Sequence, residues 1–327
     1  MIAGVAIILV SLLGVAMAST GVELIFYRII SGFGMALWNI SRHTYITDVI
    51  ANATRGRALA IFGGINRVGT FASPAIGGIL GAAFGLRLPM FFSAAMAGMV
   101  LLLAILYIRD DKPPLNHTSD QGAWPRIHQM FLTHWRVLYT AGSAQIFAQM
   151  IRQGRRLLIP LYGASVVGLN VEDIGYIVTI SAAVDMMLFP LAGHIMDKYG
   201  RKYVSVPSFV LMGIGMALIP LSSTFLGLMM ATVVIGLGNG LGSGCMMTLG
   251  ADLAPAASTG QFLGIWRFIG DMGGVGGPLA VGNFADLFGL DTAAYSLAGV
   301  GLLASLTLLF LVPETLRKKD QAQPLAR

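Results

Sequence analysis

Eight charged residues lie inside stretches that are otherwise apolar, and they carry the chemistry that this sequence offers. They are Arg28, Arg67, Arg152, Arg155, Arg156, Arg267, Asp185 and Asp271. In lipid, such a residue is costly unless it is paired or hydrated. An arginine binds anions and carboxylates, whereas a buried aspartate can take up and release a proton. These residues therefore predict a hydrated path through a membrane, with ion pairs that rearrange.

Residues 145–156 form a cluster on one predicted helix. Its polar members are Gln145, Gln149, Arg152, Arg155 and Arg156. Arg152 and Arg156 are four residues apart and share a helix face. Two interpretations stay open: the cluster clamps an anionic substrate, or it pairs with acidic residues on helices outside this sequence. Arg267 and Asp271 are also four apart, and we expect them to pair with each other.

A charged turn separates the apolar stretches 173–194 and 203–222. It carries Gly193, Asp197, Lys198, Gly200, Arg201 and Lys202. The pattern G-x-x-x-D-K-x-G-R-K resembles the signature loop of the major facilitator superfamily of secondary transporters. Asp197 can face a helix N-terminus, and Arg201 and Lys202 can meet carboxylates or lipid headgroups. The resemblance implies a gate latch, and the alternative is a turn that only fixes the topology.

The composition is that of an integral membrane protein. Of 327 residues, 56% are hydrophobic and only 11% are charged, and the mean hydropathy is +0.76. The 42 glycines favour packed helices over a barrel. The single cysteine, Cys245, excludes an internal disulfide and a cysteine-cluster metal site. We expect an all-α membrane protein without a metal, cofactor or nucleic-acid partner, and no catalytic cluster indicates an enzyme.

Ten apolar segments are long enough to cross a bilayer as helices. They lie near residues 1–19, 22–47, 57–83, 87–108, 136–164, 173–194, 203–222, 225–251, 258–286 and 291–312. The polar stretch between the fourth and fifth segments has the composition of a linker. The expected divisions are a four-helix N-terminal half (1–108), a cytoplasmic linker (109–135), a six-helix C-terminal bundle (136–312) and a cytoplasmic tail (313–327).

Basic residues sort by loop. Fourteen of them fall in alternate loops on one side, and Arg87 alone lies in the opposite loops. The positive-inside rule therefore predicts that these basic loops and the C-terminus are cytoplasmic, in a plasma-membrane protein.

An internal repeat relates the two halves at an offset of 204 residues. Gly32 aligns with Gly236, and Pro74 aligns with Pro278. Both loop aspartates, Asp48 and Asp252, share the offset, which indicates a duplicated half. The same offset places the counterpart of the signature loop just before Met1. We therefore expect the chain to lack the first two helices of a twelve-helix transporter.

Two further patterns extend the resemblance. The run from Arg28 to Ala36 matches the R-x-x-x-G-x-G-x-A pattern of the family's fourth helix, a place associated with proton coupling. A glycine and proline pattern resembles the helix-packing element of the drug:proton antiporter branch, with departures at Ala60, Ser73 and Val281. Its members here are Gly69, Pro74, Gly77, Gly78, Gly273, Gly277 and Pro278.

The family fold implies contacts between the two halves. The helices of Arg67 and Asp185 pack across the interface in the family, and the two residues lie at similar depth, so we expect them to pair. Arg28, Arg67, Asp185 and Asp271 are the coupling candidates.

The function expected from these patterns is secondary active transport by a monomer in the lipid bilayer. The leading hypothesis is proton-coupled efflux of small amphipathic compounds by alternating access. The alternative within transport is proton-coupled uptake of an anionic organic solute. The alternative of another class is a truncated, non-transporting membrane protein that acts as a sensor or partner subunit.

Overall fold

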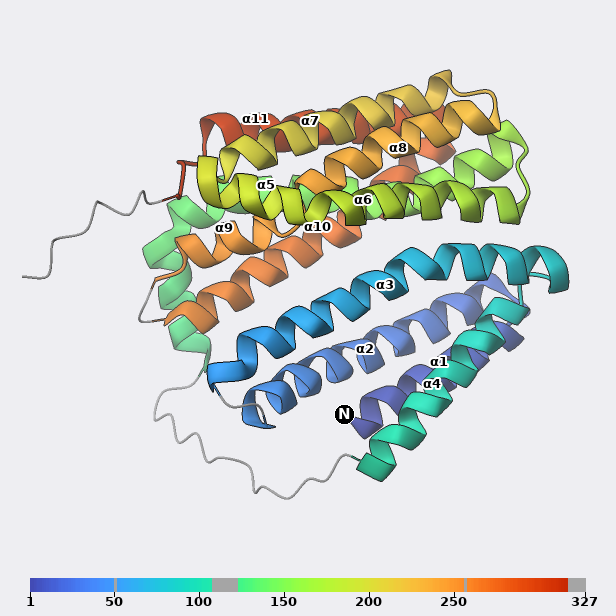
Figure 1. Ribbon diagram of the computed structural model, residues 1–327, viewed down its shortest axis with the longest axis horizontal. Coiled ribbons are helices and arrows are strands. Elements are labelled where there is room, and N and C mark those ends of the chain that lie inside the picture. Colours follow the sequence, from blue (N-terminus) through green and yellow to red (C-terminus); the bar gives the residue numbers. More distant parts are fainter. Residues whose placement is uncertain (50–51, 108–122, 256–257, 317–327) are drawn as a thin grey trace, which may run out of the picture. The chain divides into compact units, whose positions relative to one another are not determined.

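A computed structural model describes residues 1–49, 52–107, 123–255 and 258–316, and every regular element in this part of the chain is helical (Figure 1). The expected all-α class is confirmed. The chain forms two compact units, Met1–Thr118 and Ser119–Arg327, and each is described by itself.

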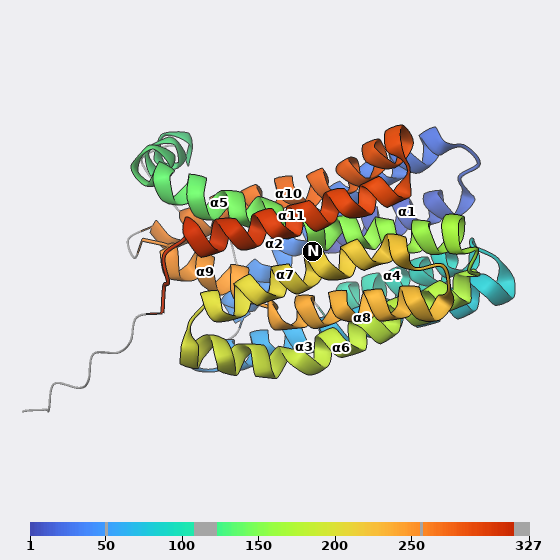
Figure 2. The same ribbon diagram turned by 90° about the horizontal axis from the view of Figure 1, so that it is seen from above.

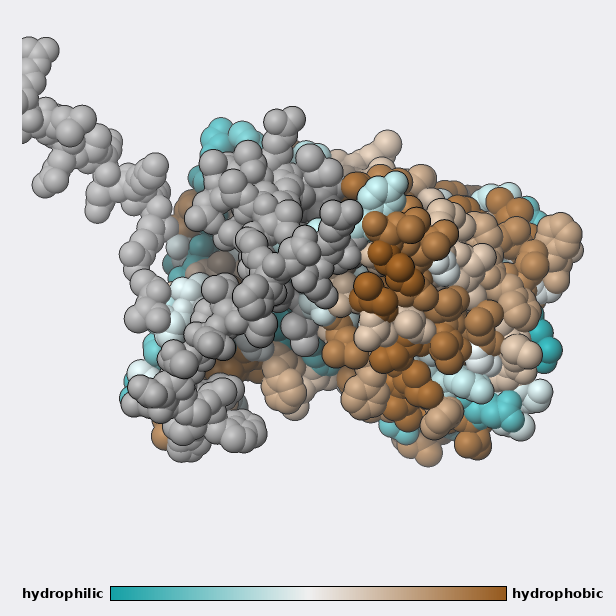
Figure 3. All heavy atoms as spheres, turned by 90° about the horizontal axis from the view of Figure 1, so that it is seen from below, coloured by the Kyte–Doolittle hydropathy of each residue, from teal (hydrophilic) through white to brown (hydrophobic). Residues whose placement is uncertain are grey.

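The described part of the first unit contains four helices: α1 (Ile2–Met17), α2 (Gly21–Val49), α3 (Asn52–Phe84) and α4 (Leu88–Tyr107). Helix α1 packs against both α2 and α4. The contact with α2 is close, because a Cβ at Gly4 would lie 2.8 Å from the Trp38 amide nitrogen. Large side chains such as Phe92 and Leu106 on α4 point outward. Figure 3 shows hydrophobic side chains over much of one described face, as expected of a surface in contact with lipid.

The second unit is a larger helical bundle. Its elements are α5 (Ala123–Tyr162), a π-helical turn (Gly163–Val167), α6 (Val171–Tyr199), α7 (Lys202–Leu218), a 3-10 turn (Ile219–Leu221), α8 (Phe225–Leu241), α9 (Cys245–Leu253), α10 (Thr259–Phe288) and α11 (Leu290–Phe310). Helix α5 packs against α10 and α11, and α8 packs against α6 and α7 (Figure 2). Side chains that include Ile151, Phe209 and Ile235 fill the core between them.

Side-chain caps set the starts of two helices in the second unit. The Asn170 side chain accepts a hydrogen bond from the Asp173 amide at the start of α6, at 2.8 Å. The Thr224 hydroxyl accepts one from the Gly227 amide at the start of α8, at 3.2 Å. Both residues are of the types that favour helix N-termini because they satisfy exposed amide groups.

Two boundaries differ from those expected. The segment 225–251, predicted as one span, is broken between α8 and α9 because Gly242 and Gly244 interrupt it and Gly244 has φ +80. Helix α5 begins at Ala123, inside the segment predicted as linker, and its backbone leaves helical geometry at His134 (φ −114, ψ 19). The proline at position 125 is compatible with a helix start, since the first turn needs no amide donor there.

Six segments among the described residues are long and apolar enough to cross a membrane. They are Gly21–Asn39, Leu88–Tyr107, Val171–Tyr199, Lys202–Leu221, Phe225–Leu253 and Leu290–Phe310. The chain is therefore a multi-pass membrane protein, and the full number of ten spans stays a prediction.

Candidate functional site

The signature loop is a turn of two residues between α6 and α7. Gly200 ends α6 with φ +124, a conformation that side chains other than glycine rarely adopt. A Cβ at this position would also lie 2.6 Å from a carboxylate oxygen of Glu314. Glycine is therefore required both by the backbone and by the close approach of the chain that follows α11.

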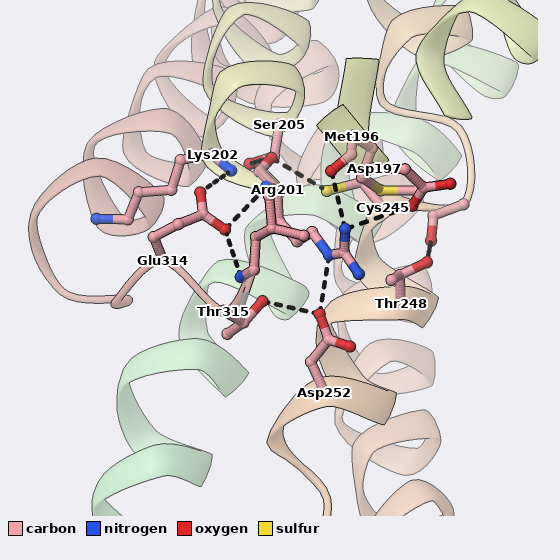
Figure 4. Close-up of polar contacts among 12 residues, drawn as sticks. Met196, Asp197, Arg201, Lys202, Ser205, Cys245, Thr248, Asp252, Glu314 and Thr315 are labelled. Atoms are coloured by element: carbon pink, nitrogen blue, oxygen red, sulfur yellow. Dashed lines mark hydrogen bonds and ion pairs between the residues drawn. The ribbon is translucent and has the colours of Figure 1, made fainter. Parts of the chain in front are cut away.

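Arg201 joins three parts of the second unit through its side chain (Figure 4). Its Nε donates to Asp252 Oδ2 in α9 at 2.9 Å, and its Nη1 donates to the Met196 carbonyl oxygen of α6 at 2.8 Å. The Thr315 hydroxyl donates to the same oxygen of Asp252, at 2.9 Å. The Arg201 side chain is only 13% exposed, so these bonds are partly shielded from solvent.

Glu314 provides the second connection. The amides of Arg201 and Lys202, at the start of α7, each donate to its carboxylate at 2.9 Å. Lys202 Nζ reaches the Leu309 carbonyl oxygen near the end of α11, at 2.8 Å. Anions at helix N-termini and cations at helix C-termini are both favourable. Arg201, Lys202, Asp252, Glu314 and Thr315, here called the Arg201 cluster, therefore connect α7, α9 and the end of α11.

Some predicted loop residues take other places. Asp197 was expected to face a helix N-terminus, but that position belongs to Glu314; the Asp197 side chain is 77% exposed and contacts Arg201 Nη1 at 3.4 Å. Lys198 is exposed and lies over the Tyr199 ring. Gly193 lies within α6, and no described atom stands within 4 Å of where its Cβ would be.

A polar pocket of about 160 Å³ lies beside α5 in the same unit. Its lining, here called the arginine pocket, consists of Gln149, Arg152, Gln153, Arg155, Arg156, Asn239, Ser243 and Gly244. The pocket collects four of the five polar residues predicted on this helix and adds residues from α8 and from the break before α9. Gln145 lies apart from it, buried against Gly270 of α10.

Arg152 is anchored at the break between α8 and α9. Its Nη2 donates to the Gly242 carbonyl oxygen at 2.8 Å, and its guanidinium lies 5.2 Å from the centre of the Phe209 ring. A carbonyl at an interrupted helix is available because the regular helical bonding stops there. The interruption that the sequence did not predict therefore fixes one wall of the pocket.

Asp185 contacts the pocket from α6. Its Oδ2 lies 4.0 Å from Arg155 Nη2 and accepts a hydrogen bond of 2.5 Å from Asn239 Nδ2 of α8. The two helices approach closely, since a Cβ at Gly236 would lie 2.5 Å from the Ser181 carbonyl oxygen and one at Gly240 would lie 2.7 Å from that of Asp185. The glycine run of α8 is thus the reason that Asn239 reaches Asp185.

The other coupling candidates, Arg28, Arg67 and Asp271, are not among the described residues that line the arginine pocket. Arg28 is exposed on α2, and the Arg67 side chain lies outside the described residues, so the expected Arg67 to Asp185 pair stays a prediction. The Arg267 to Asp271 pair is not formed. Both side chains are exposed on α10, and in the described part of the chain no carboxylate lies within 4.0 Å of Arg267.

The two copies of the glycine pattern have different surroundings. In α10, a Cβ at Gly273 would meet the Ile146 carbonyl oxygen and one at Gly277 would meet that of Met150, so α10 lies directly against α5. In α3, no described atom lies within 4 Å of the corresponding position at Gly69 or Gly77. Gly78 is buried in α3, and Pro74 and Pro278 both lie inside their helices. Close helix packing through this pattern is therefore seen in the second copy.

A bundle of membrane helices with charged residues in a polar pocket and a charged loop at one helix end is an arrangement expected of a secondary transporter. The sequence profile of the Major Facilitator Superfamily matches residues 1–151 and 143–327. The chain belongs to this superfamily, as the signature loop predicted, and it is a transporter of small molecules and not an enzyme.

Known relatives support this placement. An uncharacterized MFS-type transporter of Methanocaldococcus jannaschii is 22% identical over 275 residues, covering 83% of this chain and 70% of that protein. Multidrug resistance protein MdtH of Aeromonas hydrophila is 23% identical over 320 residues, covering 91% of this chain and 74% of its own length. The crystal structure of a D-xylose–proton symporter has the same fold, with a TM-score of 0.73 at 19% identity over 96% of this chain and 80% of the symporter.

Proposed function

We propose that this transporter exports small amphipathic compounds from the cell in exchange for protons, as a monomer in the plasma membrane. The observation that carries the proton coupling is Asp185, a carboxylate held inside a membrane helix next to Arg155 and Asn239. The similarity to a multidrug resistance protein supports the compound class and the direction.

Asp185 is suited to coupling because, among the described residues, a single arginine, Arg155, lies within 4.0 Å of its carboxylate. Protonation would remove its attraction to Arg155 and leave the guanidinium without a counter-ion. A ligand or proton shifts a conformational equilibrium only through different free energies in the two states. Breaking this pair in one state and not in the other supplies such a difference.

The Arg201 cluster would act as the cytoplasmic latch of the second unit. It connects α7, α9 and the residues after α11 by charge-assisted hydrogen bonds. Such bonds are stronger than neutral ones. The latch would favour one of the two access states.

Transport by the full chain in proteoliposomes tests this proposal, with ethidium as the probe and an imposed pH gradient. We expect proton-driven ethidium movement for the wild type and loss of that movement for Asp185→Asn. Asp286→Asn is the matched control, because this aspartate of α10 is exposed and has no ion-pair partner among the described residues. Transport by Asp185→Asn that still follows the gradient would disprove coupling through this residue.

A second function, proton-coupled uptake of an anionic organic solute, is favoured by the three arginines of the pocket. Replacing Arg152 and Arg156 together by glutamine separates the two functions. The double replacement should abolish transport if these residues clamp the solute, and should only alter its rate if the compound is a cation or neutral.

A further inference from the structure

The arginine pocket contains more positive charge than its described surroundings balance. Among the described residues, three guanidinium groups line the pocket and one neighbouring carboxylate, that of Asp185, opposes them, so positive charge exceeds negative by two. Arg155 is only 15% exposed. Charges removed from water to this extent are costly unless they are paired. The pocket therefore favours an anion.

Several buried polar atoms of the residues at the pocket also have no hydrogen-bond partner among the described residues. The Nε of Arg152, the Nε of Arg155 and the Oδ1 of Asp185 are buried and have no hydrogen-bond partner in the described part of the chain. An unmade hydrogen bond at a buried polar atom is unfavourable. Two arginine side chains of the pocket lining therefore have an unused donor in the described part of the chain. Guanidinium groups match the planar oxygens of carboxylates and phosphates.

The size of the pocket limits what it can hold. At about 160 Å³ it is smaller than the roughly 300 to 1,000 Å³ of pockets that enclose whole drug-sized ligands. It fits one oxyanion group, with the remainder of the ligand outside. Gln149 and Gln153, one helical turn apart, add amide donors to the same wall.

Asp185 lies at one side of this site, but its contact with Arg155 is long. Its distance of 4.0 Å from Arg155 exceeds the roughly 2.7 to 2.9 Å of a charge-assisted hydrogen bond. Among the described residues, the charged groups near Asp185 come from α5: Arg155 lies at 4.0 Å, Arg152 is farther off, and Arg156 lines the same pocket. Helix α8 presents the neutral Asn239, while α7 carries Lys202 and Tyr203 only at its far end, and the π-helical turn has no titratable residue.

We propose that the arginine pocket binds a carboxylate, sulfate or phosphate group of a ligand, and that Asp185 competes with this group for Arg155. A proton on Asp185 releases Arg155, so the anion binds more tightly when Asp185 is protonated. By linkage, the bound anion favours the proton equally. A symporter must bind its substrate and the proton together, so this inference deepens the second function proposed above. Anion binding itself does not depend on transport.

Binding to the purified full chain in detergent tests the proposal, measured by calorimetry and by the rise in the thermal unfolding midpoint. The probes are sulfate and benzoate, with chloride at matched ionic strength as the reference. We expect saturable binding of sulfate or benzoate by the wild type that becomes tighter as the pH is lowered. Arg155→Gln should weaken it about tenfold or more, the loss expected for one charge-assisted hydrogen bond.

Two further variants separate this site from a general effect of charge. Asp185→Asn should bind the anion more tightly than the wild type and lose the dependence on pH, an increase that a merely destabilised protein would not show. Arg267→Gln removes an exposed arginine of α10 and should leave binding unchanged. Absence of saturable binding, equal loss in Arg267→Gln, or weaker binding by Asp185→Asn would each overturn the proposal. Since transport is measured separately, ethidium export can succeed when anion binding fails.

Discussion

At the scale of single residues, Glu314 ties the end of the last helix to the signature loop. Burial raises the pKa of its carboxyl, but hydrogen bonds from the backbone amides of Leu316, Lys202, Arg201 and Thr315 lower it, and the pKa lies below its ordinary value of 4.5. Its ionised form is therefore stabilised in the fold. This carboxylate contributes stability that is complete above pH 4.5 and is lost as the pH falls through its lowered pKa.

Replacing Glu314 by glutamine should lower the free energy of unfolding by about 1 kcal/mol, the size of a lost helix cap. The amide keeps one acceptor oxygen but places a donor group where the second α7 amide now donates. Thermal unfolding of the purified chain in detergent measures this change. The variant should also lose part of the acid dependence of stability below pH 4.5, since the titrating group is gone.

Asp286→Asn is the control for this measurement as well, because it removes one exposed carboxylate without breaking a described hydrogen bond. An unfolding midpoint for Glu314→Gln equal to that of the control at pH 7 would show that the contacts at the start of α7 add nothing to stability.

The sequence predicted parts of this site and missed others for a physical reason. The types of Arg201 and Lys202 indicated carboxylate partners, and the structure places Arg201 on Asp252. The role of Glu314 could not be predicted, because it lies 113 residues from Arg201 along the chain and only the course of α11 brings the two together.

At the scale of elements, the glycines of α8 determine how closely it approaches α6. A Cβ at Gly240 would lie 2.7 Å from the Asp185 carbonyl oxygen and 2.9 Å from its Cα. These are backbone atoms, so relief requires the helices to separate. Separation would move Asn239 away from Asp185, and the arginine pocket would lose one wall.

Gly240→Ala should therefore destabilise the chain by about 1 to 3 kcal/mol, the range for overpacking a core. Gly299→Ala in α11 is the matched control, because no described atom lies within 4 Å of its Cβ position. There, alanine should stabilise the helix by up to about 1 kcal/mol through its better propensity. Unfolding midpoints that shift in opposite directions support the packing argument, and a neutral Gly240→Ala contradicts it.

Sequence reasoning located most elements but not the break in the eighth predicted span. Apolar length marks a membrane helix regardless of its details, which is why most of the expected segments overlap a described helix. The same glycines that indicated a packing face also interrupt the helix at Gly242 to Gly244, and composition does not separate these two effects. The break mattered for function, since it provides the carbonyl that anchors Arg152.

At the scale of the whole molecule, the distribution of basic residues predicts the orientation in the membrane. Loops rich in lysine and arginine stay on the cytoplasmic side because moving their charges across the bilayer is unfavourable. The signature loop, with Lys198, Arg201 and Lys202, belongs to this set. The turn after α7, which contains Ser223, has no basic residue and should face outward.

Variants that each carry one introduced cysteine can measure this orientation, by their reaction with a maleimide that does not cross membranes. The native Cys245 is fully buried, so the wild type should remain unlabelled by a membrane-impermeant maleimide and serves as the blank. In intact cells, Ser223→Cys should react and Lys198→Cys should react only after the membrane is opened. Both positions are exposed in the fold, so access to the reagent and not burial determines the result. Labelling of Lys198→Cys in sealed cells would show that the orientation is the opposite of the one predicted. The Arg201 cluster would then lie at the outer end of the transport path.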